Sequence, residues 1–420
     1  MEAAGQHIHH TVDHLFRQQS GKMMAVLTRM LGLHQIALAE DIVQESLLLA
    51  MNTWPYNGTP DNPEAWLQRV ARNKAIDHIR RAQRSSYILS RYKSQLLADD
   101  TDSTGMPVFY PECEIADSML RMLFACCHPS IPPESQVAMA LKVLCGLSIS
   151  EIARAFLTGE ETIAKRIYRA REKMRAGKVP LDLPFHTAWS SRLDMVLHCL
   201  YLLFNEGYHS GHPEQLVRED LCEEAIRLAH LLTGHKETSQ PRTYALLALF
   251  CFQASRLKAR TDDRGQIILL QQQDRSLWYR PLIEKGFHYL EAAAEPFEVT
   301  PYHLEAGIAS LHAAAPSFEQ TNWMAIYQLY TTLYQLQCHP VVTVNKAIAA
   351  GYALGPAEGL SQLLALDPPP AYHYYYAALG EMYFLMHRKE EACYWYKQAL
   401  QHVKHAREQE LLRHKIQSCS

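Results

Sequence analysis

Residues 146–175 read GLSISEIARAFLTGEETIAKRIYRAREKMR and contain two short helical patterns separated by a glycine-bearing break. Ser148 and Glu151 have the spacing of a capping box, which predicts a helix over residues 149–156. Thr158 and Glu161 repeat that spacing and predict the start of a second helix. Two short helices joined by such a turn are typical of a helix-turn-helix.

The second of these helices is strongly basic. Its apolar stripe consists of Ile163, Ile167 and Ala170, which lie at helical spacing. Cations surround this stripe: Lys165, Arg166, Arg169, Arg171, Lys173 and Arg175. A basic second helix suits insertion into a major groove, where Arg and Lys bond base edges or phosphates. An ordinary solvated helix is the alternative, but the caps, the turn and the charge together favour DNA binding.

A second basic helix is expected from about residue 62 to residue 85. Asn62 is a suitable cap, and Pro63 stands in the first turn, where proline is favoured. The outward cations are Arg69, Arg72, Lys74, Arg80, Arg81 and Arg84. This helix alone would also be consistent with a solvated amphipathic helix.

The chain as a whole reads as helix, so the expected fold class is all-α. Its 420 residues imply several domains, and 48% hydrophobic residues with 20% charged residues are typical of a soluble protein. The net charge of −3 excludes a uniformly basic nucleic-acid coat, but not local basic helices. No segment alternates like a strand, and the best candidate, 267–270, is too short to matter. Four blocks follow: residues 8–82, a polar flexible linker at 83–114, a helical unit at 115–178 and a helical body at 185–420.

Taken together, these segments resemble the extracytoplasmic-function sigma factors of bacterial RNA polymerase. Residues 39–45 (AEDIVQE), 65–67 (AWL) and 72–77 (RNKAID) are similar to region two of that family. Residues 146–153 and 162–171 are similar to its region four. Further stretches at 124–129, 200–208 and 259–262 resemble a subgroup with a long C-terminal extension of tetratricopeptide-like repeats. The turn at 158–162 departs from the commoner Ile-Ser-x-Gly-Thr pattern, which leaves the promoter sequence open.

The resemblance implies core RNA polymerase and promoter DNA as partners, and it assigns roles to particular residues. Block 8–82 would bind polymerase and the minus-ten element, and block 115–178 the minus-thirty-five element. The polymerase-binding residues would be Asp41, Gln44 and Glu45, whose spacing puts them on one helix face. The minus-ten residues would be Tyr56, Asn57, Trp66, Arg69, Arg72, Asn73 and Lys74, with Trp66 equally suited to a core position. The minus-thirty-five residues would be Lys165, Tyr168 and Arg169 on bases, with Thr162, Arg166 and Arg171 on phosphates.

The extension contains one tetratricopeptide signature within residues 340–404. Its members are Tyr376, Leu379, Gly380, Tyr383, Ala392, Tyr396 and Ala399. A degenerate copy, anchored by Ala357, is expected over roughly residues 340–366. Such stacks present a concave surface to a protein or peptide, so we expect the extension to regulate the factor; a passive stabilising domain is the alternative. The sign of its effect stays open.

Other function classes fit less well. No GxSxG, phosphate-loop or HExxH motif occurs, so we expect no enzyme and no cofactor. Cys126, Cys127 and His128 invite a metal site, but no second Cys/His pair has ligand spacing, so we expect buried thiols and no metal. No apolar run could span a bilayer, and residues 1–20 lack the apolar segment of a secretory signal, which indicates a cytoplasmic protein without membrane contact. The alternative function is a helix-turn-helix regulator with a helical sensory domain. That class has no use for the region-two residues, and a pure scaffold has no use for a basic recognition helix.

Overall fold

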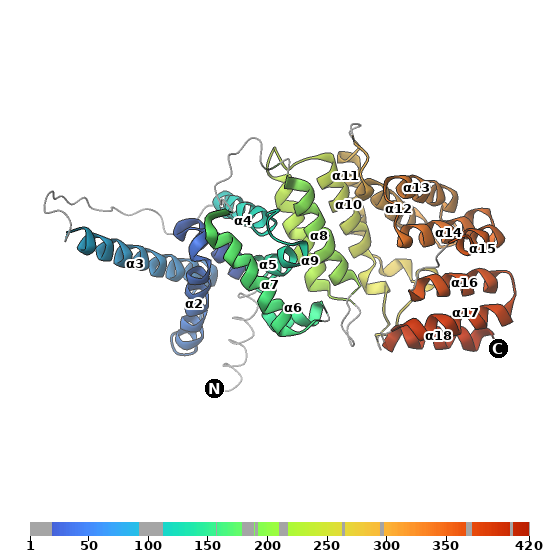
Figure 1. The fold of residues 1–420 in the computed structure, drawn as a ribbon, viewed down its shortest axis with the longest axis horizontal. Coiled ribbons are helices and arrows are strands. Elements are labelled where there is room, and N and C mark those ends of the chain that lie inside the picture. The colour runs from blue at the N-terminus through green and yellow to red at the C-terminus, as the bar shows by residue number, and fades with distance from the viewer. Residues whose placement is uncertain are drawn as a thin grey trace. The chain divides into compact units, whose positions relative to one another are not determined.

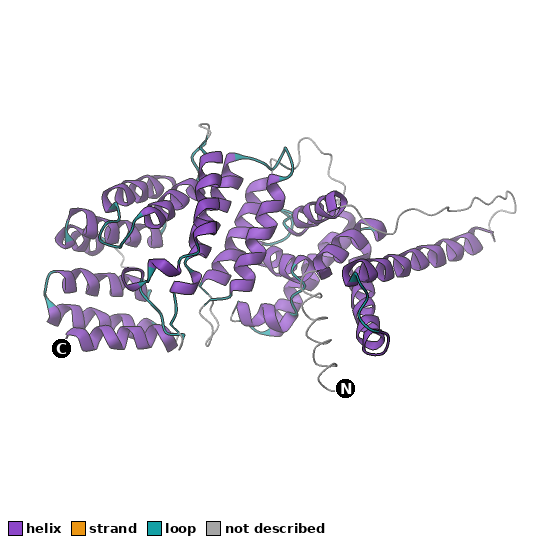
Figure 2. Ribbon diagram, turned by 180° about the vertical axis from the view of Figure 1, so that it is seen from behind, coloured by secondary structure: helices purple, strands orange, loops and turns teal. Residues whose placement is uncertain are grey.

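The computed structural model of the chain describes residues 19–91, 112–156, 158–178, 189, 192–209, 217–262, 265–294, 298–366, 372–403 and 406–419. Within these ranges the secondary structure is helical, and no strand is present (Figure 2). A lone antiparallel bridge joins Thr261 to Ile267, at the start of the short segment that most resembled a strand. The expected all-α fold class is confirmed.

The chain divides into two compact units, residues 1–199 and 200–420. Unit 1 begins with helical residues 19–31. Its further helices are α2 (Ile36–Asn57), α3 (Pro63–Arg91), α4 (Glu112–Cys126), α5 (Pro133–Leu144), α6 (Ile149–Ala155) and α7 (Glu160–Lys173). Helix α8 (Leu193–Tyr208) crosses the boundary between the units. Unit 2 continues with α9 (Glu219–Thr233), α10 (Pro241–Ser255), α11 (Arg280–Ala292), α12 (Pro301–Ala314), α13 (Trp323–Leu336), α14 (Pro340–Leu354), α15 (Pro356–Leu364), α16 (His373–Leu385), α17 (Lys389–His402) and α18 (Ala406–Cys419) (Figure 1).

The helix-turn-helix forms from local signals. Gly146, at φ 68°, ends α5 and turns the chain toward Ser148, a conformation that glycine adopts at little cost. The Ser148 hydroxyl accepts from the Glu151 N–H at 3.1 Å, and the Glu151 carboxylate accepts from the Ser148 N–H at 2.8 Å. This reciprocal capping box is confirmed, and a cap of this kind stabilises a helix by about 1 kcal/mol.

The second expected capping box is wrong. Helix α7 begins at Glu160, and its N-cap is Gly159 in an extended conformation, with no side chain capping the helix. The cap position is thus one residue later than Thr158. The helix is instead favoured at this end by the two acidic residues of its first turn, Glu160 and Glu161, which complement the helix dipole.

Helix α3 starts where the sequence predicts. The Asn62 side chain accepts from the Ala65 N–H at 3.0 Å, and Pro63 opens the helix. The helix runs on to Arg91, nine residues past the end of the first expected domain at residue 82. Residues 83–91 (QRSSYILSR) contain neither glycine nor proline, so no helix-breaking residue stops α3 at residue 82.

Unit 1 extends beyond the basic helix. Trp189 is fully buried and stacks on Phe124 of α4 with ring centroids 5.1 Å apart. Arg192 donates a hydrogen bond to the backbone carbonyl of Phe124 and lies over its ring. The contacts that complete this unit therefore come from residues after the expected domain end at 178.

In the extension, helix pairs occur where the repeat signature predicts them. Helices α16 and α17 lie side by side (Figure 1), and a Cβ atom added to Gly380 would come within 2.6 Å of the Tyr396 ring. Tyr396 is buried and fills the space that the glycine leaves. In the upstream pair the close approach is made by Gly351 and Gly359, since a Cβ on Gly359 would lie 2.7 Å from the Gly351 Cα. The expected anchoring role of Ala357 is wrong: its side chain is exposed.

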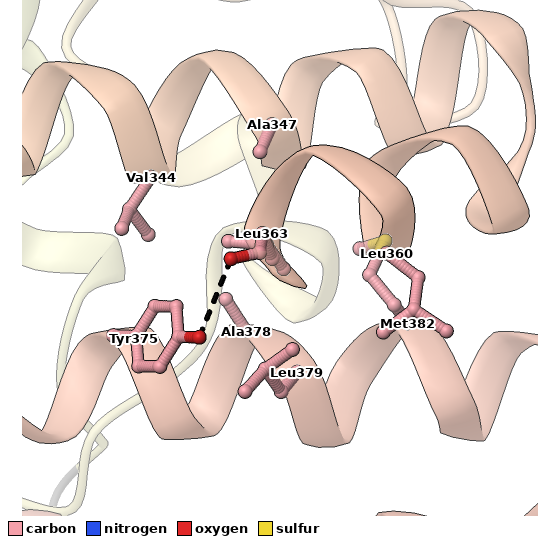
Figure 3. Packing of buried hydrophobic residues seen from close by; sticks show 8 residues of the cluster. All are labelled: Val344, Ala347, Leu360, Leu363, Tyr375, Ala378, Leu379 and Met382. Atoms are coloured by element: carbon pink, nitrogen blue, oxygen red, sulfur yellow. Dashed lines mark hydrogen bonds between the residues drawn. The ribbon is translucent and has the colours of Figure 1, made fainter. Parts of the chain in front are cut away.

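A common core joins these pairs. Leu363 of α15 packs with Leu379 and Met382 of α16, all fully buried (Figure 3). The Tyr375 hydroxyl donates a hydrogen bond to the Leu363 carbonyl oxygen at 3.3 Å. Burying each such leucine contributes about 1.5–3 kcal/mol. Each pair thus completes its core on its neighbour, as stacked repeats do.

Candidate polymerase and promoter interfaces

One face of helix α7 is open and carries the expected base-reading residues. Ile163 and Ile167 are buried against unit 1, which orients the helix. The residues on the open face are Thr162, Lys165, Tyr168 and Arg169, and Tyr168 is 65% exposed. A helix oriented in this way can present its polar face to a nucleic-acid groove.

Lys165 is not withdrawn from this face by its partner. It forms an ion pair with Glu161 at 2.6 Å, but the two side chains are 62% and 82% exposed. Exposed pairs of this kind contribute about 0–1 kcal/mol. A phosphate or a guanine edge can therefore compete for the ammonium group.

Two other cations of α7 are paired with acids of other helices of unit 1. Arg166 forms an ion pair with Glu134 of α5, and Arg171 forms one with Glu40 of α2. Arg166 and Arg171 are also the arginines expected to contact phosphates. The structure therefore separates the six expected residues into four on an open face and two that are paired with acids of other helices.

Glu40 of α2 contacts cations of two other helices, α5 and α7. Its carboxylate contacts Arg171 and also lies 3.0 Å from the Lys142 ammonium of α5. Burial acts to raise the pKa of Glu40, but Arg171 and Lys142 outweigh it and hold that pKa below its usual value. The carboxylate is therefore charged at neutral pH and neutralises part of the basic helix.

The expected polymerase-binding residues share one exposed face of α2. Asp41, Gln44 and Glu45 are all exposed, while Ile42 and Val43 are buried beneath them. Glu45 also contacts Lys74 of α3 at 2.6 Å, so one acidic residue of this face is joined to the minus-ten segment.

Sequence reasoning missed the apolar part of this face. Leu48 and Leu49 are 56% and 42% exposed and follow Gln44 and Glu45 by one helical turn. Large exposed apolar side chains beside a polar face are typical of a protein interface. The signal was available in the i, i+4 spacing, but an all-apolar run, 47–51, reads equally well as core.

The residues expected to capture a minus-ten base are only partly together. Tyr56 is 88% exposed at the end of α2, and Asn57 beside it is exposed too. Trp66 is half-buried and packs edge-on against the buried Trp54, with ring centroids 5.5 Å apart. Trp66 therefore supports the loop from the core side, and Tyr56 is the more accessible aromatic ring.

The remaining minus-ten residues lie along α3. Arg69 and Asn73 are exposed, and Arg72 and Lys74 are half-buried. Lys74 is the partner of Glu45. Two of these four side chains therefore point freely into solvent from the basic face of the helix.

The cysteine pair next to His128 lies in the interior. Cys126 and Cys127 are fully buried, and Cys199 contacts Cys127. Burial raises the pKa of the Cys126 thiol, which keeps it protonated. These thiols fill core space, as buried cysteines commonly do.

Comparison with known families agrees with this geometry. The family described as Sigma-70 region 2 matches residues 15–85, and the family described as Sigma-70, region 4 matches residues 121–174. A family of unknown function, DUF6596, matches residues 192–294.

Similar proteins support the same assignment. An uncharacterized protein of Rhizobium meliloti (strain 1021) is 39% identical over 327 residues, 78% of this chain and 76% of that protein. The ECF RNA polymerase sigma factor SigE of Mycolicibacterium smegmatis is 29% identical over 163 residues, 39% of this chain and 60% of that protein. The ECF RNA polymerase sigma-E factor of Haemophilus influenzae is 28% identical over 173 residues, 40% of this chain and 87% of that protein. The chain belongs to the extracytoplasmic-function sigma factors.

As a sigma factor, the protein directs promoter recognition at transcription initiation and is not an enzyme. Its family works with core RNA polymerase and promoter DNA. The alternative of a simple helix-turn-helix regulator does not account for the region-two match. No helix in the described ranges is long and apolar enough to cross a membrane.

Proposed function

We propose that α7 reads the minus-thirty-five element, with Lys165, Tyr168 and Arg169 on base edges and Thr162 on a phosphate. The observation that carries this assignment is the exposure of all four on one face above a buried apolar stripe. Each good base contact is worth about 1–3 kcal/mol of discrimination. Arg166 and Arg171 are assigned to phosphates, which they reach after leaving Glu134 and Glu40.

For the minus-ten element, the proposed contacts divide into two groups. Tyr56 and Asn57 receive an unstacked base, because both side chains are exposed at the end of α2, next to the loop that leads to α3. The backbone and base-edge contacts come from the remaining proposed residues: Trp66, Arg69, Arg72, Asn73 and Lys74. Asp41, Gln44 and Glu45, extended by Leu48, form the polymerase surface. All of this takes place in the cytoplasm, where the polymerase is.

The extension, expected at residues 185–420, is proposed to regulate promoter use through a bound partner. Its stacked pairs α14–α15 and α16–α17 support this role, because stacks of this kind commonly present a binding surface. A peptide or protein partner is the class that such surfaces usually bind. We also propose that the borders of the functional regions lie near residues 82, 115 and 178.

Run-off transcription with purified core polymerase tests the assignment of α7. The template carries the promoter of the factor's own gene, and the full chain is compared with a Lys165→Ala/Arg169→Ala variant. Loss of the specific transcript is expected, with polymerase binding retained. A Lys173→Ala/Arg175→Ala variant is a matched control, since it removes the same charge from the end of α7 and the segment that follows it, outside the proposed reading face. Equal transcription by both variants would refute the base-reading assignment.

A variant inside the extension tests its role. Gly380→Leu forces a side chain into the Tyr396 ring and should separate α16 from α17 while leaving unit 1 intact. A change in transcript level in either direction supports regulation and gives its sign. Unchanged transcription, with loss of extension structure verified by limited proteolysis, would identify a passive domain.

A further inference from the structure

The extension contains a large cavity that the sigma function does not use. Its volume is about 590 Å³, within the range of small-molecule sites, and its lining residues lie between 209 and 415. Helices α14, α16 and α18 contribute walls, and residues 267–271 cross it. The cavity lies entirely within unit 2.

One wall of the cavity is aromatic. Trp323 and Tyr352 stack with ring centroids 4.5 Å apart and planes inclined by 27°. Phe318 meets Tyr352 edge-on at 5.2 Å. Ile348 and Leu411 add aliphatic surface. Such a wall favours a flat, apolar group.

Another part of the lining carries two arginines. Arg256 donates from its Nε to the Tyr208 hydroxyl at 2.7 Å, and the Arg260 guanidinium lies 3.8 Å from the centroid of the same ring. Both cations therefore share a neutral partner. Among the described residues, neither arginine has a carboxylate within ion-pair distance. Burial, and to a smaller extent the nearby charge of Arg256, lowers the pKa of Arg260.

The two acids of the lining have partners other than these arginines. Glu408 accepts from the Tyr374 hydroxyl at 2.7 Å and lies 3.4 Å and 3.5 Å from the rings of His209 and His373. Glu381 accepts from the Tyr396 hydroxyl at 2.9 Å and is paired with Lys415. Neither acid neutralises the two arginines. The lining therefore contains three cations, Arg256, Arg260 and Lys415, against two carboxylates, Glu381 and Glu408, and it combines this formal excess of one positive charge with an aromatic wall.

We propose that this cavity binds a small organic anion, with its flat apolar body against Trp323 and Tyr352 and its acidic head group on Arg256 and Arg260. Guanidinium groups match the geometry of carboxylate and related oxyanions and lose little freedom on binding them. This site deepens the proposed regulatory role of the extension by giving the class of its effector. Its test is a binding measurement on the free factor, so its failure is distinguishable from a failure in transcription.

Two fluorescent probes with closely related bodies test the site in the full chain. 1-Anilinonaphthalene-8-sulfonate carries an acidic head, and N-phenyl-1-naphthylamine has the same ring system without it. We expect one-to-one binding of the sulfonate, at least about tenfold tighter than that of the neutral probe, since hydrogen bonds to charged groups are the stronger ones.

Variants assign the binding to the cavity. Arg256→Gln and Arg260→Gln should each weaken the sulfonate by about tenfold and leave the neutral probe unchanged. Arg280→Gln, an exposed arginine of α11 outside the cavity, is the matched control and should change neither probe. Asn345→Trp fills the cavity and should abolish both, which keeps the test valid if the arginine variants unfold. Equal affinity for the two probes, or sulfonate binding that survives Asn345→Trp, would overturn the proposal.

Discussion

The contact between Glu40 and Arg171 gives a direct prediction for DNA binding. Glu40→Gln removes a carboxylate that holds both Arg171 and Lys142, whose side chains are 27% and 19% exposed. If Arg171 binds a phosphate, it must first leave Glu40, and wild-type affinity includes that cost. The substitution should therefore make the free factor bind duplex DNA more tightly.

The magnitude follows from the geometry. At about 3 Å and an effective dielectric constant of about 20, the gross attraction is about 5 kcal/mol, most of which offsets desolvation of the two ions. A net value of about 1–2 kcal/mol, intermediate between exposed and buried pairs, corresponds to about 5- to 30-fold in affinity. Because Glu40 has a pKa below its usual value, the difference should persist unchanged across neutral pH.

Fluorescence anisotropy with a labelled duplex of arbitrary sequence measures this effect, because phosphate contacts do not depend on sequence. Glu172→Gln is the matched control, since it removes the same charge from α7 next to Arg171, and its own partner, Arg175, is 72% exposed. Tighter binding by Glu40→Gln than by Glu172→Gln is expected, together with a steeper salt dependence. Equal affinities for the two variants would show that Glu40 does not restrain a phosphate-binding residue.

Three further predictions concern folding and polymerase binding. Gly380→Ala should lower the free energy of unfolding of the extension by about 1–3 kcal/mol in chemical denaturation, since its Cβ would lie 2.6 Å from the Tyr396 ring. Gly234→Ala is the control and should change that free energy little, because its Cβ would lie 3.6 Å from the nearest neighbouring atom. Burial raises the pKa of Glu305 to about 7, so the stability contributed by its neutral form is fully present below about pH 4.5 and is lost as pH rises through 7. Denaturation curves of the wild type should therefore show about 1–3 kcal/mol less stability at pH 8 than at pH 5, and Glu305→Gln should abolish this difference. Leu48→Asp should weaken binding to core polymerase by about tenfold or more in a competition assay, because it places a charge in the apolar part of the proposed interface; unchanged binding would exclude Leu48 from it.

Features formed by residues close together in the chain could be predicted from the sequence, and features formed by distant residues could not. Asn62 and Ser148 cap helices through bonds that span three residues, and both were correctly identified. The capping box predicted at Thr158 is wrong because Gly159, which has no side chain, occupies the cap position. The acidic residues of the first turn stabilise that end of the helix instead. In the extension, Gly380 opposite Tyr396 is part of a spacing pattern, so it could be found. The Gly351–Gly359 contact belongs to no such pattern.

The remaining features depend on contacts that no local pattern contains. Trp189 lies after an expected domain border, yet it completes a core with Phe124, 65 residues earlier. The cavity depends on Arg256 and Arg260 meeting Tyr208 from about fifty residues away. The sequence shows which segments are rich in cations, but it does not show which of those cations form ion pairs within the protein.

That distinction matters for how a sigma factor with a net charge of −3 can bind DNA. Total charge cannot attract the duplex, so binding depends on which cations remain available at the surface. In α7, Arg166 and Arg171 are paired with acids of other helices, while Arg169 stands exposed and Lys165 has only a weak, exposed partner. Of these four cations, the two that remain accessible therefore lie on the proposed base-reading face. The same contacts should reduce nonspecific attraction, and the Glu40→Gln measurement on a duplex of arbitrary sequence tests that reduction.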